Sequence, residues 1–112
     1  MRESLKYKFH NYEFVLDKSI DNDIVRCIDT VLSSLGTNVR NVLKFYLSKR
    51  GIEFEDIPDR PEEFSSFLRE IYGEAAIIIE KMIVVRLARE FEIEPESEGL
   101  ADVIHEIKTR LG

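Results

Sequence analysis

Residues 73–91 read GEAAIIIEKMIVVRLAREF, and this stretch decides the fold. At about 100° per residue on a helix, one arc centred on Glu80 carries Ala76, Ile77, Ile83, Val84, Leu87, Ala88 and Phe91. The opposite side carries Ile78, Ile79, Met82 and Val85. A helix that is apolar on two sides packs between neighbours, so the pattern predicts a central helix over about residues 74–91. The stretch is too short and too charged to span a membrane.

Helical patterns flank this segment on both sides. They predict helices over 22–35 and 37–50, a third that opens at Pro61, and a last one that begins between residues 95 and 99. An acidic connection over residues 51–60 has an apolar anchor, formed by Ile52, Phe54 and Ile57. We therefore predict a mainly α fold, a five-helix cluster around the central helix. Three structural glycines separate its elements: Gly36, Gly51 and Gly73.

The N-terminal segment has a different pattern. Residues 5–16 are best interpreted as a β-hairpin with His10-Asn11 as its two-residue turn, because Asn tolerates the left-handed conformation that such turns need. The pairing would place five apolar or aromatic side chains on one face: Leu5, Tyr7, Phe9, Tyr12 and Phe14. A helical interpretation of the same residues competes with it, because Leu5, Phe9, Tyr12 and Leu16 share one helical stripe.

Length and composition indicate a single domain over residues 1–112, with the hairpin in 1–18 and the helical domain in 22–111. The single cysteine, Cys27, lies among apolar helix positions, which predicts a buried, inert thiol. No apolar run has the length of a signal peptide, so we expect a cytoplasmic protein. The charged fraction of 34%, with no Trp, resembles the composition of hyperthermophile proteins.

Between residues 24 and 111, a series of short motifs follows one another in a characteristic order. They are Leu35-Gly36, Tyr46-Leu47, Gly51-Ile52 with Glu55-Asp56-Ile57-Pro58, Pro61 to Phe64, Leu68, Ile71 with Gly73, and then Ala76, Ile79-Glu80 and Ile83. This order resembles the archaeal Nitrosopumilus-type output domain, the fifth of its kind, and related small archaeal helical families of unknown function. The resemblance implies an output or interaction module in archaeal signalling or regulation, and it brings no catalytic residues.

Glu80 is the first candidate for chemistry. A carboxyl group among apolar neighbours has a raised pKa if it is unpaired, as catalytic acids often do. A structural ion pair explains the same pattern more simply, with Arg40, Lys44 or Arg86 as possible partners. The sequence positions no second catalytic group beside it, so a small enzyme or ligand-binding domain centred on Glu80 is an alternative rather than our first choice.

The last helix carries a second candidate, the pair Asp102 and His105, flanked by Glu98 and Glu106. An i, i+3 pair of this kind can ligate a metal ion, but the polar face of an amphipathic helix is ordinarily just solvated. No second His or Cys cluster and no phosphate-binding glycine loop accompanies it. We therefore predict no metal, no cofactor and no catalytic residue.

Helices 22–35 and 37–50 could also form a helix-turn-helix with the second as a basic recognition helix. That helix would contribute Asn38, Arg40, Asn41, Lys44 and Lys49. Against this, the net charge is −6, and Phe45 and Tyr46 add bulk where a groove-facing helix is polar. A basic helix that complements the acidic segment after it is the simpler explanation, so nucleic acid is an unfavoured partner.

These observations favour a non-enzymatic interaction or signalling output module. Because a two-stranded hairpin is not stable alone, its aromatic face would pack on the helical core, on a protein partner or on a second copy of the chain in a homodimer. DNA binding through helix 37–50 and chemistry at Glu80 are the two alternatives.

Overall fold

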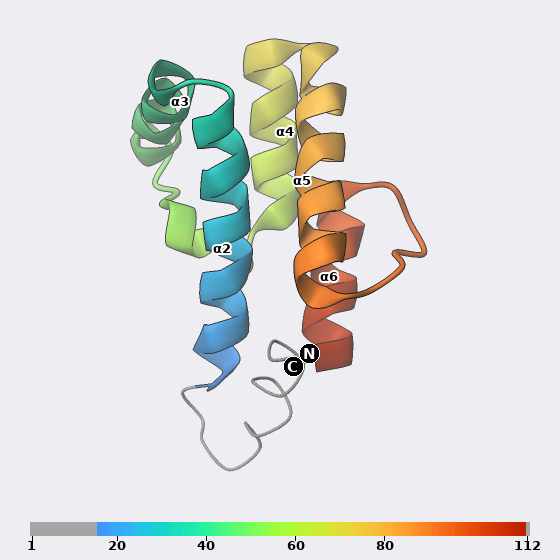
Figure 1. The fold of residues 1–112 in the computed structure, drawn as a ribbon. Coiled ribbons are helices and arrows are strands. Elements are labelled where there is room, and N and C mark those ends of the chain that lie inside the picture. The colour runs from blue at the N-terminus through green and yellow to red at the C-terminus, as the bar shows by residue number, and fades with distance from the viewer. Residues whose placement is uncertain (1–15, 112) are drawn as a thin grey trace.

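The computed structural model describes residues 16–111, and it consists there of five α-helices and one short 3₁₀ helix (Figure 1). The elements are α2 (Leu16–Ser34), α3 (Thr37–Lys49), η1 (Phe54–Asp56), α4 (Pro61–Tyr72), α5 (Ala75–Phe91) and α6 (Leu100–Leu111). The prediction of a mainly α fold is therefore confirmed for this part of the chain. The predicted hairpin and its aromatic face lie outside the described residues.

Helix α5 is the hub of the assembly. It packs against α2, α4 and α6, while α3 and η1 lie against α2. Figure 1 shows α4 and α5 side by side as an antiparallel pair and α2 running antiparallel to α5. Gly73 makes the reversal between α4 and α5 with φ 59° and ψ −131°, a conformation that residues with a Cβ atom rarely adopt. Gly36 and Gly51 also have positive φ angles.

The core is formed by the inward sides of all these elements. Fully buried side chains include Ile24, Ile28 and Leu32 of α2, Phe64 and Leu68 of α4, Ile83 and Leu87 of α5, and Ile104 and Ile107 of α6. Ile52, Phe54 and Ile57 are buried too, which confirms the apolar anchor of the acidic connection. Cys27 is buried, as its helical position predicts.

Two helix starts differ from the sequence-based expectation. α2 begins at Leu16 rather than near residue 22, because Ile20 is buried and continues the i, i+4 series of Ile24 and Ile28. α6 begins at Leu100, just after the expected window. The preceding residues are held outside the helix by hydrogen bonds to it, from the Ser97 hydroxyl to Asp102 and from the Glu96 amide to Glu106.

One prediction about the central helix is wrong on one side. Of the four residues assigned to that side, Ile79 is buried, but Ile78 is 64% exposed, Val85 57% and Met82 37%, although their apolar character suggested a covered face. Ile77, assigned to the buried arc, is 52% exposed. The neighbours α2, α4 and α6 all pack on the side of α5 that carries Ala76, Glu80, Ile83 and Leu87, so no described element covers the other side.

Candidate interaction surface

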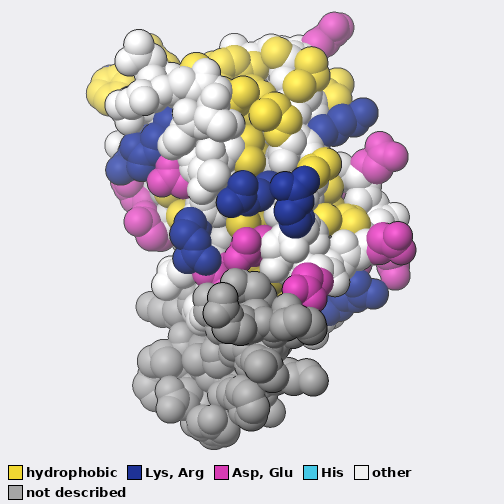
Figure 2. Space-filling view, viewed as in Figure 1, with side chains coloured by type: hydrophobic (Ala, Val, Ile, Leu, Met, Phe, Trp, Pro, Cys, Tyr) yellow, Lys and Arg dark blue, Asp and Glu magenta, His cyan; other side chains and the backbone are white. Residues whose placement is uncertain are grey.

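The α5 stripe, as we call Ile78, Met82 and Val85, is an exposed aliphatic row on one face of α5. The i, i+4, i+7 spacing places the three side chains on consecutive turns, which is the spacing of a seam between packed helices. Figure 2 shows hydrophobic side chains gathered over the upper part of this face, with Lys and Arg side chains below them. Contiguous exposed apolar surface of this kind marks interaction sites more often than isolated exposed residues do.

Beside the stripe lies an open groove between α2 and α5. This α2–α5 groove has a cavity volume of about 430 Å³. Its lining comprises Val31 of α2 together with Ile78, Lys81, Met82, Val85, Arg86 and Arg89 of α5. Val31 is only 6% exposed and lies at the bottom of the groove, so the groove has an apolar floor.

The charged residues of the groove are all cationic: Lys81, Arg86 and Arg89. Among residues 19–111, every other Lys and Arg side chain forms an ion pair or lies over an aromatic ring. The three groove cations have neither kind of partner within that part of the chain. Although the net charge of the protein is −6, the cations of residues 19–111 that have neither an ion pair nor a ring contact are thus all at this one groove.

Glu80 is buried in the core, on the opposite side of α5 from the stripe. It is 5% exposed, and its nearest cation is Arg69 of α4, whose Nη2 lies 3.8 Å from Oε1. None of the three suggested partners pairs with it; Arg40, for example, binds Asp29 instead. Within the described residues, Glu80 Oε2 and the Ser65 hydroxyl are both buried without a hydrogen-bond partner.

Burial raises the pKa of Glu80, and Arg69 opposes this shift, as do the Leu100 backbone and Ser65 more weakly. The arrangement supplies one carboxyl group and one largely exposed guanidinium beside the buried Ser65 hydroxyl. Cys27 is no candidate nucleophile, because burial raises the pKa of its thiol to about 11 and keeps it neutral. The local geometry fits a carboxyl group held in the core by packing.

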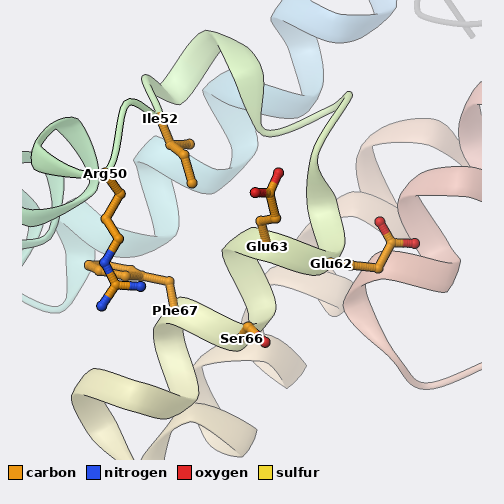
Figure 3. A pocket seen from close by; sticks show the side chains of 6 residues that line it. All are labelled: Arg50, Ile52, Glu62, Glu63, Ser66 and Phe67. Atoms are coloured by element: carbon orange, nitrogen blue, oxygen red, sulfur yellow. The ribbon is translucent and has the colours of Figure 1, made fainter.

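A second cavity, of about 320 Å³, lies between α4 and the segment after α3 (Figure 3). Its lining comprises Arg50, Ile52, Glu62, Glu63, Ser66 and Phe67. Its charged groups have partners nearby. Arg50 donates to Glu70 at 2.6 Å with its guanidinium 5.0 Å from the centre of the Phe67 ring, and Arg60 donates to Glu63 at 2.5 Å and 3.0 Å. Glu62 in turn lies 2.7 Å from Nε2 of His105, so each charged side chain of the lining has a partner within the fold.

The acidic and histidine side chains of α6 do not come together. His105 Nε2 lies 2.7 Å from Oε2 of Glu62 on α4, and Asp102 accepts a hydrogen bond from the Ser97 hydroxyl at 3.0 Å. Glu106 accepts one from the Glu96 amide at 3.1 Å. Between residues 16 and 111, no group of three or more His, Cys, Asp or Glu side chains could hold a metal ion.

Helix α3, the proposed recognition helix, uses its cations within the fold. Arg40 donates two hydrogen bonds to Asp29 of α2, at 2.5 Å and 3.1 Å, and the pKa of that carboxyl group is lowered mainly by this contact. Lys44 lies 6.0 Å from the centre of the Phe54 ring and Lys49 4.9 Å from that of Phe45. These partners differ from the expected one, because the acidic side chains of residues 53–63 are not among them.

No family model, curated protein or solved structure matches this chain. The resemblance to the archaeal output domain therefore stays a prediction. No helix within residues 16–111 combines the length and apolar character needed to cross a membrane.

The α5 stripe was not predicted as a site, because its residues were assigned to the core. The signal that could have revealed it is Lys81 and Arg89, which share its side of the helix.

Proposed function

We propose that this chain is a non-enzymatic protein-interaction module that binds a partner helix in the α2–α5 groove. The observation that carries the proposal is the α5 stripe, whose three side chains are 37–64% exposed beside a concave apolar groove. Burying a fully exposed side chain of this kind is worth about 1.5–3 kcal/mol. Because the three stripe residues are about half exposed, a partner that covers all of them gains about 2–5 kcal/mol before its own ordering cost.

A helix is the partner shape that suits this surface. Two antiparallel helices form the walls of the groove, and a third helix can lie along the groove with its side chains between theirs. Helix-in-groove recognition uses anchors at i, i+3 or i+4, and i+7, which match the spacing of Ile78, Met82 and Val85. The partner is therefore expected to present an apolar row with the same period.

The other functions predicted from the sequence have less support. Arg40 of α3 pairs with Asp29, and Lys44 and Lys49 lie over aromatic rings, so a DNA-binding role has few cations on that helix left for phosphate contacts. Neither of the cavities described above is lined by Glu80, so an enzymatic or ligand-binding role there lacks a substrate site. Both alternatives stay predictions that no contact or cavity favours.

The experiment is a display selection of a helical peptide library against the chain and against its Ile78→Ser/Val85→Ser variant. A matched control carries Val42→Ser and Ile71→Ser, which lie outside the groove and are similarly exposed, at 46% and 41%. We expect the chain and the control to enrich the same peptides and the stripe variant to lose them. Thermal unfolding checks that both variants keep the fold, because substitutions at exposed positions usually change stability by less than about 0.5 kcal/mol. Enrichment that survives in the stripe variant would refute the proposal.

A further inference from the structure

We infer that the α2–α5 groove accepts an acidic amphipathic helix from another protein, with Asp or Glu on both sides of its apolar row. This inference rests on the proposed function and adds the chemistry of the partner. Its evidence is independent of the stripe, because it comes from the charges at the rim of the groove.

The first step is that the rim charge is not used within the fold. Lys81, Arg86 and Arg89 line the groove and form no ion pair or ring contact among residues 19–111, unlike every other Lys and Arg there. Lys81 and Arg89 are exposed and Arg86 is half-buried. Three cations of one sign at one groove generate a positive potential that attracts acidic side chains and speeds their approach.

The second step is the position of these cations around the helix. At about 100° per residue, Lys81 and Arg86 fall on opposite flanks of the stripe, and Arg89 follows Val85 one turn further along it. In paired helices, charged residues that flank an apolar seam contact charges of the partner helix and set its choice and orientation. A partner that fits both flanks carries carboxylates on both sides of its own seam.

A second copy of the chain fits this surface poorly. A two-fold contact places the same patch on both subunits. With α5 antiparallel to itself and centred between Met82 and Val85, each flank of the stripe would lie beside the same flank of the other copy. Lys81 would then lie on the same side as Lys81 of the other copy, Arg86 on the same side as Arg86, and Ile78 would face Arg89. Like charges face each other in that pairing, and Arg89 loses water without gaining a carboxylate.

A membrane surface is likewise disfavoured. The groove is concave, with Val31 at its bottom, whereas an interfacial apolar face is convex and inserts between lipid headgroups. The net charge of −6 also repels an anionic bilayer as a whole. A narrow acidic helix experiences mainly the local rim, because screening limits electrostatic interactions to about 10 Å at ordinary salt.

The test uses a synthetic amphipathic peptide of about three heptads with Leu on the seam and Glu on both flanks, and a second peptide with Lys in place of Glu. Binding is measured by fluorescence anisotropy for the chain, for Lys81→Glu/Arg89→Glu, and for the matched control Lys44→Glu/Lys49→Glu. We expect the Glu peptide to bind the chain and the control equally. It should bind the groove variant about tenfold or more weakly at low salt, and the Lys peptide should regain affinity for that variant alone.

The outcomes separate the inference from the proposed function. If both peptides bind equally and binding disappears in Ile78→Ser/Val85→Ser, the acidic partner is refuted and the interaction module stands. If neither peptide binds and the display selection also yields none, both are refuted. Binding to vesicles of phosphatidylglycerol without peptide binding would point to a membrane and overturn the inference. A dimer in sedimentation analysis that dissociates on substitution of the stripe would assign the groove to a second copy and overturn it as well.

Discussion

Substituting Glu80 should change the free energy of unfolding, and the structure predicts both the direction of that change and its dependence on pH. The perturbation is Glu80→Gln, which keeps the shape of the side chain and removes its charge. In the fold the carboxyl group is 5% exposed, Oε2 has no hydrogen-bond partner among the described residues, and the pKa is raised by burial. A raised pKa means that the folded state holds the proton more tightly than the unfolded state does.

The direction of the pH effect on stability follows from this difference between the folded and unfolded pKa values of Glu80. The carboxyl group contributes its full share of stability when it is protonated in both states, below the unfolded pKa. That share is lost as pH rises through the higher folded pKa. Burial penalises the charged form of this carboxyl group in the folded state, and the Gln variant removes that penalty. A buried polar atom without a partner costs about 1–3 kcal/mol, and Arg69, 63% exposed at 3.8 Å, compensates little of it.

The assay is urea unfolding of both proteins at pH 7.5 and near pH 4. We expect Glu80→Gln to raise the free energy of unfolding at pH 7.5 by about 1 kcal/mol, a shift of several degrees in Tm, and the advantage to shrink toward zero at the lower pH. Glu70→Gln is the matched control, because Glu70 is exposed and its pKa is lowered by a hydrogen bond from Arg50. That variant should lose stability at neutral pH, with the loss disappearing as pH falls. A Glu80→Gln variant that is less stable at pH 7.5, or whose advantage does not depend on pH, would refute the reasoning.

Three further predictions concern the core and the hub helix. Ile83→Ala removes a fully buried side chain where α5 meets its neighbours and should lower the free energy of unfolding by about 2–5 kcal/mol in urea; a loss below about 1 kcal/mol would mean the site is not packed. Gly73→Ala places a Cβ atom at φ 59° and ψ −131°, so it should cost about 1–3 kcal/mol by the same measurement although the space around it is open; a neutral variant would contradict the turn conformation. Cys27 should react with a thiol reagent only after unfolding, because its thiol is buried and its pKa is about 11; rapid labelling of the native chain at pH 8 would show that α2 opens there.

The sequence predicted the helices well where strong local signals mark their ends. Pro61 at the first position of α4 and the glycines before α3 and α5 are such signals, because they act through backbone conformation and need no tertiary context. The start of α2 is not marked by such a local signal. Ser19 and Asp21 resemble caps, but the burial of Ile20 extends the helix past them, and that burial depends on packing.

The partner of Glu80 depends on the packing of α4 against α5. Arg69 lies in the last turn of α4 and Glu80 near the start of α5, so the geometry of the reversal at Gly73 brings the two side chains together. The α5 stripe also shows that a sequence pattern does not identify tertiary neighbours. Apolar periodicity identifies which sides of a helix avoid water, but it does not identify which neighbour covers each side. The structure covers one side with α2, α4 and α6 and leaves the other exposed among the described residues.

The proposed function explains why the α5 stripe lies beside unpaired cations. The core is already filled by the inward side of α5, so Ile78, Met82 and Val85 add little to folding. Exposed aliphatic residues favour unwanted association, and unpaired like charges beside them oppose contact between two copies of the same groove. The same charges that repel a second copy of the chain attract an acidic helix. Lys81, Arg86 and Arg89 would then exclude self-association and select the partner through the same three side chains.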